Sequence, residues 1–356
     1  MGNILITGGA GFIGANFVRY WRQNYPDDQI TVLDALTYAG NRASLDDISD
    51  LELIVADICE TAKVIDLLRE KNIDTIVHFA AESHVDRSID MPDRFIETNI
   101  IGTHSLLKAA KSVWLDVDIP NINHKFHHVS TDEVYGSLGP EEPAFNELTP
   151  YAPNSPYSAS KAASDHLVRA YHHTFGLNTT TSNCSNNYGP YQFPEKLIPL
   201  FLINCLTGKP LPVYGDGMNV RDWLHVNDHC VGIARVIESG RVGETYVIGG
   251  GEELPNIQVI DAICDHVDNA FAADPNLRIR FPNSPGASGQ KCETLKTFVI
   301  DRLGHDRRYA IDEAKARQEL GYVPSMNFEE GFSSTFQWYI ENEKWWRSIL
   351  DKTYLE

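Results

Sequence analysis

The sequence predicts an α/β protein in which helices cover both faces of a doubly wound parallel sheet, followed by a smaller C-terminal α/β domain. Strand-like apolar runs alternate with helical patterns every 20–30 residues or so through the first half of the chain, as in βαβ units. The first of these strands leads into a glycine-rich turn near the N-terminus. Beyond about residue 185 the alternation gives way to loop-rich segments with shorter strands.

Length and composition indicate a globular enzyme-sized chain. The 356 residues include 49 acidic and 30 basic side chains, for a formal net charge of −19. Such an excess of negative charge argues against non-specific binding to nucleic acid or anionic membranes. The six cysteines form no C-x-x-C pair, which favours free thiols in a reducing compartment. Because no long apolar run and no basic leader is present, we expect a cytoplasmic protein.

The first strand is expected at residues 3–7, and a helix follows through about residue 23. Between them, Gly8, Gly11 and Gly14 lie at G-x-x-G-x-x-G spacing. A turn of this kind brings backbone N–H groups and a helix N-terminus up to a pyrophosphate, where a Cβ would block the approach. The strand–turn–helix context therefore favours a dinucleotide site over a plain turn.

The second strand, residues 29–33, ends in Asp34, which lies 20 positions beyond Gly14. An acid at this distance is expected to accept hydrogen bonds from the adenosine ribose hydroxyls. It favours NAD over NADP, whose 2′-phosphate it would repel. The alternative is that Asp34 is an ordinary residue at the end of a strand.

The remaining elements of the first half follow the same alternation. We expect strands at residues 51–56, 74–79, 125–129 and 179–183, and helices at 61–71, 92–112 and 157–175. Right-handed crossovers between such strands give a Rossmann-type sheet, with ligands at the carboxyl ends of the strands.

The pattern predicts two domains. Residues 1–185 should form the NAD-binding domain, and residues 186–356 should mainly bind substrate. A later strand, near residues 244–248, is a candidate to return to the NAD-binding domain. Helices are expected in the second part at 197–207, 228–239, 256–270, 312–320 and 328–343.

Tyr157 and Lys161 lie four residues apart at the start of a helical pattern. A phenol with a pKa near 10 is a weak base at neutral pH, and correcting this requires roughly 4 kcal/mol of phenolate stabilisation. A lysine one helical turn later places an ammonium near the phenol and contributes to it. The pair could then take a proton from a sugar hydroxyl while NAD takes the hydride from the same carbon.

Two adjacent acids follow the strand at 125–129, in the sequence Ser130-Thr131-Asp132-Glu133. Oxidation at C4 of a hexose would acidify its C5 proton. Elimination of water across C5 and C6 then needs a base at C5 and an acid at the C6 hydroxyl. Two carboxyl groups suit these duties if their surroundings separate their pKa values. The alternative is a solvated acidic turn.

The glycine triplet, Ser130-Thr131 and the Tyr157–Lys161 pair resemble the extended short-chain dehydrogenase/reductase family of nucleotide-sugar enzymes. Residues 80–88, 130–136 and 301–309 resemble its 4,6-dehydratase branch, whose substrate is dTDP-glucose, and the likeness covers essentially the whole chain. It implies that Glu133 is the C5 base, that Asp132 is the acid for the C6 hydroxyl, and that Thr131 hydrogen-bonds the C4 oxygen. The product would be a 4-keto-6-deoxy sugar, with NAD regenerated.

The resemblance also implies binding residues. Cofactor contacts would be made, mainly by backbone atoms, by Phe12, Ile13, Asp57, Ile58, Ala80, Ser83 and Thr98, in addition to the glycines, Asp34, Tyr157 and Lys161. Substrate contacts would be made by Ser83, Thr131, Asn186, Glu195, Lys196, Leu197, Pro212, Tyr214, Arg221, Asn256 and His305. Arg221 suits a diphosphate, since a guanidinium binds it bidentately; the alternative is a surface ion pair. Leu303 stands where the family would have proline.

Several alternatives remain open. A UDP-sugar 4,6-dehydratase or a nucleotide-sugar 4-epimerase would use the same scaffold, and thymine differs from uracil by one methyl group. A non-catalytic NAD-binding protein is disfavoured because Tyr157, Lys161 and both acids are present. The histidines show no metal-ligand spacing: His127 and His128 should point to opposite faces of their strand. The family implies a homodimer formed through the helices at 92–112 and from 157.

Overall fold

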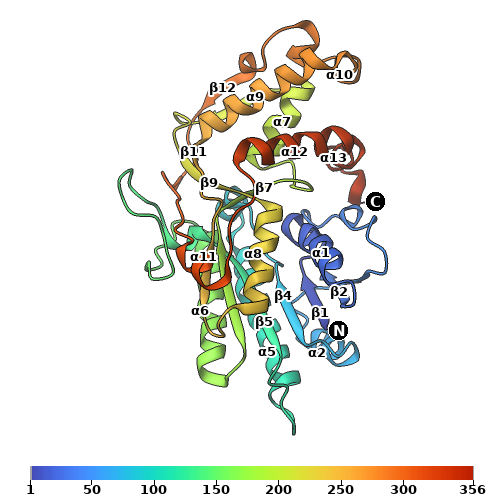
Figure 1. The fold of residues 1–356 in the computed structure, drawn as a ribbon, viewed down its shortest axis with the longest axis vertical. Coiled ribbons are helices and arrows are strands. Elements are labelled where there is room, and N and C mark those ends of the chain that lie inside the picture. The colour runs from blue at the N-terminus through green and yellow to red at the C-terminus, as the bar shows by residue number, and fades with distance from the viewer. Residues whose placement is uncertain (1, 356) are drawn as a thin grey trace.

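The computed structural model describes residues 2–355 and confirms the α/β fold class (Figure 1). A seven-stranded parallel sheet forms the centre of the described chain. From one edge to the other its strands are β10 (Thr245–Ile248), β6 (Thr179–Cys184), β5 (Lys125–Thr131), β4 (Thr75–His78), β1 (Asn3–Thr7), β2 (Gln29–Asp34) and β3 (Glu52–Val55). The strand order reverses between β1 and β4, which is where ligands bind in such sheets.

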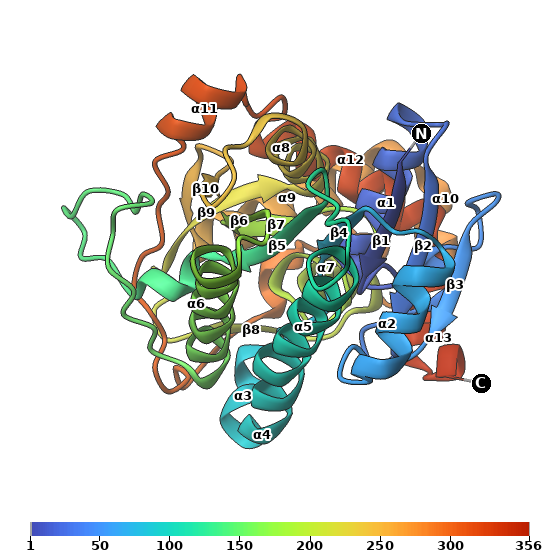
Figure 2. The same cartoon turned by 90° about the horizontal axis from the view of Figure 1, so that it is seen from below.

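Helices cover both faces of this sheet, as Figure 2 shows in end view. One face carries α1 (Phe12–Asn24) and α8 (Val226–Ser239), and the other carries α2 (Thr61–Glu70), α5 (Thr103–Trp114) and α6 (Pro156–Phe175). Each layer closes over its own apolar cluster, because strands buried on both faces present apolar side chains to both. The chain returns to this layer late: β10 pairs with β6, and α11 (Ala314–Leu320) packs beside it.

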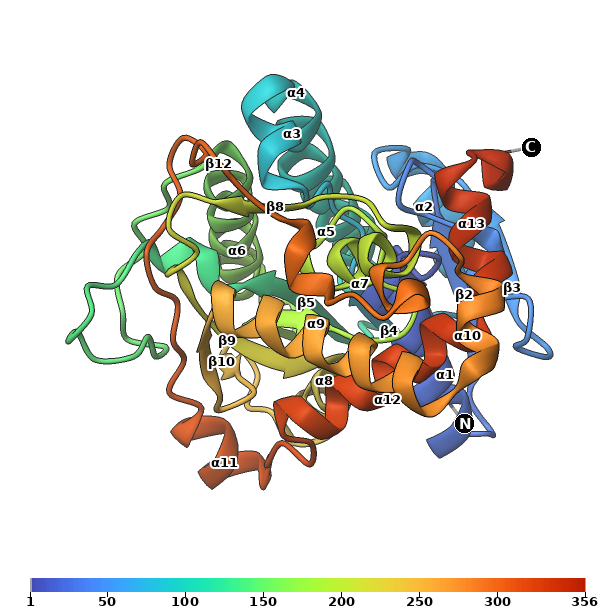
Figure 3. The same ribbon diagram turned by 90° about the horizontal axis from the view of Figure 1, so that it is seen from above.

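A second lobe lies over the carboxyl ends of the strands (Figure 3). Its core joins α7 (Leu197–Thr207), α9 (Asn256–Ala273), α10 (Pro275–Arg280), α12 (Phe328–Glu341) and α13 (Glu343–Leu350). Two small sheets connect it to the first lobe: β11 (Glu253–Pro255), β9 (Val220–His225) and β7 (Asn186–Tyr188) form one, and β12 (Lys296–Val299) with β8 (Leu211–Tyr214) forms the other. Short 3₁₀ turns occur at Arg42–Ser44, Asp132–Tyr135, Pro285–Ser288, Cys292–Leu295 and Thr353–Leu355.

Two predicted boundaries need correction. The fifth strand continues through Thr131 instead of ending at 129, because backbone pairing with β6 extends to Thr131 opposite Cys184. The helix predicted at 92–112 is not uniform: α3 (Val85–Asp90) and α4 (Pro92–Phe95) precede a π-helical segment, Ile96–Gly102, before α5 begins. Such π segments often mark functional sites, and this one contains Asn99, whose side chain contacts Glu82 and Ser160.

Within residues 2–355, no helix has the length and apolar composition needed to cross a bilayer.

Candidate active site

A cavity of about 480 Å³ lies between the carboxyl ends of the sheet strands and the second lobe. This volume falls within the range of small-molecule sites. All the residues predicted for the cofactor, the substrate and the chemistry line it. They are Gly8, Gly11, Phe12, Ile13, Gly14, Asp34, Asp57, Ile58, Ala80, Ser83, Thr98, Thr131, Asp132, Glu133, Tyr157, Lys161, Asn186, Glu195, Lys196, Leu197, Pro212, Tyr214, Arg221, Asn256 and His305.

The turn between β1 and α1 requires glycine at two positions, Gly8 and Gly14, because a side chain at either one would collide with the backbone. Gly8 has φ +70°, and a Cβ there would lie 2.6 Å from the backbone nitrogen of Ala80. A Cβ on Gly14 would lie 2.2 Å from the Gly8 carbonyl oxygen. Gly11 differs, since its nearest neighbour would be that same oxygen at 3.3 Å. A side chain at Gly11 would therefore meet this one atom and no other within 4 Å, and its absence leaves room for an approaching pyrophosphate.

Asp34 ends β2 beside this turn. Its Oδ2 accepts a hydrogen bond from the Ala10 backbone N–H at 2.9 Å, and its Oδ1 accepts one from Leu36 at 2.8 Å. Burial raises the pKa of Asp34, and these two backbone donors oppose that shift. A carboxylate has about four acceptor sites, so Asp34 retains capacity to accept ribose hydroxyls. The residues present thus fit a bound dinucleotide.

The end of β5 delivers Thr131, Asp132 and Glu133 to the middle of the cavity. The Thr131 hydroxyl caps the following 3₁₀ turn by accepting the Glu133 N–H at 3.3 Å, and it donates to Asp132 Oδ1 at 3.3 Å. Gly136 ends the turn at φ +93°, where a Cβ would meet the Ala152 carbonyl oxygen at 2.5 Å. The tight turn aims consecutive side chains at one site.

The two carboxyl groups have different surroundings. Burial raises the pKa of Asp132 well above its usual range, and the charges of Glu133 and Asp222 raise it further. Burial also raises the pKa of Glu133, but Lys196 and Arg302 oppose that shift. Asp132 therefore favours its protonated form, while cations favour the ionised form of Glu133. The two groups thus differ in the charges around them, although the pKa of both is raised.

Tyr157 and Lys161 lie one turn apart on α6 and face the end of β5. The Lys161 amino group donates to the Val129 carbonyl oxygen at 2.9 Å, and its side chain is 4% exposed. Burial and the charge of Glu133 raise the pKa of Tyr157, which opposes a role as base, while contact with Thr131 lowers it. The phenol thus needs additional positive charge before it can act as a base.

The substrate side of the cavity is built by β9, the loop before α7 and the loop after β12. Arg221 is 4% exposed and donates to the Val220 and Asp306 carbonyl oxygens. The alternative of a surface ion pair is therefore wrong. His305 bonds Asp301 at 2.6 Å. Glu195, predicted as a substrate contact, accepts a hydrogen bond from Tyr38 and pairs with Arg87 at 3.3 Å, so it also joins the two lobes.

Buried polar atoms without a partner also mark this cavity as a ligand site. Atoms of its lining that have no hydrogen-bond partner within residues 2–355 are Asp86 Oδ1, Ser130 Oγ, Asp132 Oδ2, Ser185 Oγ, Asn186 Oδ1, Gln192 Oε1, Trp223 Nε1, Asn256 Oδ1 and Arg302 Nε. Buried polar groups are normally satisfied. Their concentration here indicates that a polar ligand completes them.

Sequence reasoning missed several lining residues, including Glu82, Gln192 and Trp223. Arg302 also lines the cavity, and it belongs to the segment 301–305 that the family resemblance had marked for substrate contacts. Trp223 was out of reach, since β9 was not predicted and nothing in its short sequence indicates which side chains face inward.

Comparisons with known proteins agree with this geometry. The family model described as GDP-mannose 4,6 dehydratase matches residues 5–335. The chain is 52% identical to dTDP-glucose 4,6-dehydratase of Xanthomonas campestris pv. campestris (strain B100), covering 99% of this chain and 97% of that protein. It is 50% identical to the Neisseria meningitidis serogroup B enzyme of the same name, with 99% and 98% covered.

The chain belongs to the dTDP-glucose 4,6-dehydratase family. Among solved structures of that family, DesIV from Streptomyces venezuelae, with NAD and dTDP bound, superposes with a TM-score of 0.84 at 46% identity, covering 98% of this chain and 99% of that one. The recognition made from the glycine turn, the two acids and the Tyr157–Lys161 pair is thereby confirmed.

Proposed function

We propose that this chain is an NAD-dependent hydro-lyase that converts dTDP-glucose to dTDP-4-keto-6-deoxy-glucose. The observation that carries the proposal is the pair of adjacent carboxyl groups at the end of β5, which have opposite electrostatic surroundings and lie beside Tyr157 and Lys161. Family membership supports the same reaction. An epimerase would need the oxidation but would leave the two acids without a duty.

The glycine turn and Asp34 would hold NAD, which when bound would supply a hydride acceptor for C4 and a hydride donor for C6. Tyr157 takes the proton of the C4 hydroxyl, and Thr131 hydrogen-bonds that oxygen. The Lys161 ammonium supports the phenolate from one helical turn away. Tyr157 and Lys161 both lie on α6, whose first turn is fixed by a capping box between Ser155 and Ser158.

Glu133 removes the C5 proton, which the C4 carbonyl has made acidic. Asp132 donates a proton to the C6 hydroxyl, which leaves as water. Asp132 suits this role because burial and neighbouring negative charge keep it protonated. Afterwards C5 regains a proton on the face that Glu133 occupies. Opposite protonation states of two adjacent acids thus account for the elimination.

The diphosphate of the substrate would bind beside Arg221, with Asn186 and Asn256 offering amide groups nearby. Arg221 is held by backbone carbonyl oxygens, so its guanidinium keeps its orientation. The remaining predicted contacts, Ser83, Glu195, Lys196, Leu197, Pro212, Tyr214 and His305, surround the same space.

Three further expectations belong to the proposal. The enzyme acts as a homodimer through the face of α5 and α6, it resides in the cytoplasm, and residues 1–185 form the NAD-binding unit with 186–356 mainly binding substrate. The pairing of β10 with β6 supports the return of the chain to the first unit. Exposed apolar side chains at Ile96, Ile101 and Phe175 support the dimer.

The test is turnover of dTDP-glucose and of UDP-glucose, followed by mass spectrometry of the sugar nucleotide. The proposal expects dTDP-glucose to lose one water and to give a product with the alkaline absorbance of a 4-keto sugar. Faster turnover of UDP-glucose would move the assignment to a UDP-sugar dehydratase. A product of unchanged mass would indicate a 4-epimerase.

A further inference from the structure

Asp165 is a buried carboxylate that the reaction described above does not use. It follows Tyr157 and Lys161 on α6 at the next helical turn, so the three side chains share one face of the helix. Asp165 is 5% exposed and, within the described chain, is not among the residues that line the cavity. Burying a carboxylate is costly unless it is paired and hydrogen-bonded. Its partners therefore need explaining.

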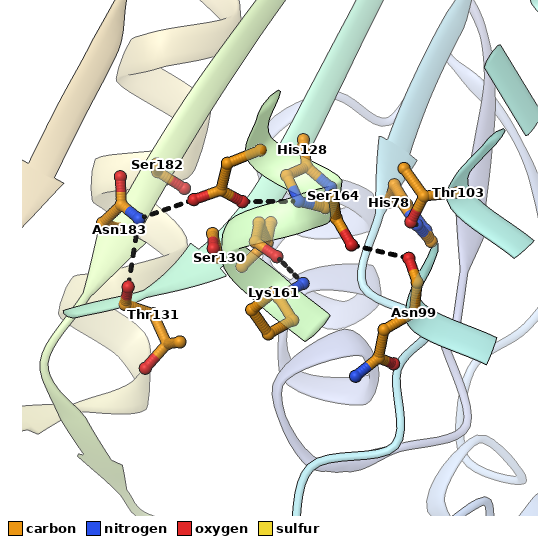
Figure 4. Close-up of polar contacts among 12 residues, drawn as sticks. His78, Asn99, Thr103, His128, Ser130, Thr131, Lys161, Ser164, Ser182 and Asn183 are labelled. Carbon is orange, nitrogen blue, oxygen red and sulfur yellow. Dashed lines mark hydrogen bonds and ion pairs between the residues drawn. The ribbon is translucent and has the colours of Figure 1, made fainter. Parts of the chain in front are cut away.

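Donors from three separate segments converge on this carboxylate. His128 on β5 approaches Oδ1 through Nε2 at 3.0 Å, Tyr151 donates to Oδ2 at 2.9 Å, and Asn183 on β6 donates to Oδ2 at 3.2 Å. Figure 4 shows His128 and Asn183, which lie on adjacent strands and approach this carboxylate from opposite sides. Burial would raise the pKa of Asp165, but His128 and Lys161 lower it overall. These donors favour the carboxylate form of Asp165.

The same network reaches the catalytic end of β5. The Asn183 amide donates to the Thr131 carbonyl oxygen at 3.0 Å as well as to Asp165. Lys161 donates to the Val129 carbonyl oxygen. Groups on α6 and β6 therefore hold the strand at Val129 and at Thr131, immediately before Asp132 and Glu133 (Figure 4).

Most of the groups around Lys161 carry no negative charge that would stabilise its ammonium form. Burial lowers its pKa, and Asp165 is the main influence that raises it. The titratable groups that face it are Tyr157 and Asp165 on α6, His78 on β4, His128 on β5 and Cys184 on β6. Burial lowers the pKa of both histidines, that of His128 to about 4, and raises the pKa of Cys184. These three groups are therefore neutral near pH 7.

We propose that Asp165 is a positioning residue for the dehydratase: its carboxylate keeps Lys161 charged and, through Asn183, fixes the Thr131 end of β5. The inference rests on the proposed function, because it assigns Lys161 the duty of supporting the Tyr157 phenolate. Asp165 acts through these residues and does not touch the substrate.

Asp165→Asn removes the charge with little change of shape. A neutral His128 must carry its proton on Nε2 to donate to Asp165, and its Nδ1 has no partner within residues 2–355. Moving that proton to Nδ1 would let an amide at position 165 donate to Nε2. The Tyr151 and Asn183 hydrogen bonds can persist onto the amide oxygen. The variant should therefore fold.

The experiment compares kcat and KM for dTDP-glucose against pH in the wild type, Asp165→Asn and Asp265→Asn. Asp265 is an exposed residue on α9, so its variant removes the same charge far from Lys161. For Asp165→Asn we expect kcat to fall roughly tenfold to a hundredfold with KM little changed. The alkaline limb of its kcat profile should move to lower pH, because Lys161 loses its proton more easily. The control should match the wild type.

Asp165→Glu keeps a carboxylate on the same face of α6 and serves as a second variant, which separates the effect of the charge from that of the hydrogen bonds. Its kcat should fall because the hydrogen bonds shift, while its alkaline limb should stay near that of the wild type. An unmoved limb in Asp165→Asn, or an equal shift in both variants, would overturn the inference. A wild-type enzyme that fails to dehydrate dTDP-glucose would instead overturn the proposed function, so the two failures are distinguishable.

Discussion

Asp132 and Glu133 are neighbours in the chain, yet their carboxyl groups face different sets of charged residues. Asp132 faces Asp222 as well as Glu133, whereas Glu133 faces Lys196 and Arg302. Asp132 is buried and Glu133 is partly buried, and the loss of solvent raises the pKa of both carboxyl groups. The cations near Glu133 oppose the increase in its pKa. The two carboxyl groups at the end of β5 thus differ in the charges around them, as the acid and base roles proposed for them require.

The role of Asp132 can be tested with the leaving group. Asp132→Asn should lower kcat on dTDP-glucose by about 10²–10⁴-fold, the usual contribution of a general acid. A substrate analogue with fluorine at C6 needs less help from an acid, because fluoride leaves without a proton. The variant should therefore lose much less activity on the fluorinated analogue, measured as fluoride release. Equal losses on both substrates would exclude Asp132 as the acid for C6.

The glycine turn offers a matched pair of variants. A Cβ on Gly14 would lie 2.2 Å from the Gly8 carbonyl oxygen, whereas one on Gly11 would lie 3.3 Å from it. Gly14→Ala should therefore lower the thermal unfolding temperature even without cofactor. Gly11→Ala should lose less stability than Gly14→Ala but should lose NAD affinity, because its Cβ occupies the approach of the pyrophosphate. Calorimetric NAD titration checks this, and unchanged affinity in Gly11→Ala would contradict the proposed placement.

The local sequence was sufficient to predict the elements whose residue types are dictated by a nearby turn or ligand. Gly14 and Asp34 mark the first βαβ unit because only particular residues fit a tight turn and a ribose hydroxyl. Thr131, Asp132 and Glu133 follow an apolar strand, so their place at its carboxyl end follows from parallel topology.

The parts that were missed depend on distant segments. Asp222 carries no local pattern that places it beside the two acids. The return of α8 to the first lobe depends on which apolar faces remain uncovered after both lobes form. The π-helical segment around Asn99 likewise reflects tertiary contacts with Glu82 and Ser160, since its sequence follows an ordinary helical period.

Buried histidines make stability depend on pH. Burial lowers the pKa of His127 to about 3, below its unfolded value of 6.5. The unfolded chain therefore binds more protons between these values, so stability is fully present above pH 6.5 and is lost as pH falls towards 3. In His127→Gln, the loss of unfolding free energy between neutral pH and roughly pH 5 should be smaller than in the wild type by about 2 kcal/mol.

Urea unfolding at both pH values measures this difference. His173→Gln is the control, because His173 is exposed on α6. An equal pH dependence in the wild type and His127→Gln would show that His127 does not contribute.

The central claim is that Glu133 removes the C5 proton after C4 has been oxidised, and Glu133→Gln tests it most directly. The variant is mixed with one equivalent of dTDP-glucose in D₂O, and the near-ultraviolet absorbance of reduced nicotinamide is followed with mass spectrometry of the sugar. The account predicts that absorbance appears and persists, while loss of water and deuterium uptake at C5 fall by at least about 10²-fold. Loss of water and deuterium uptake at the wild-type rate would contradict it.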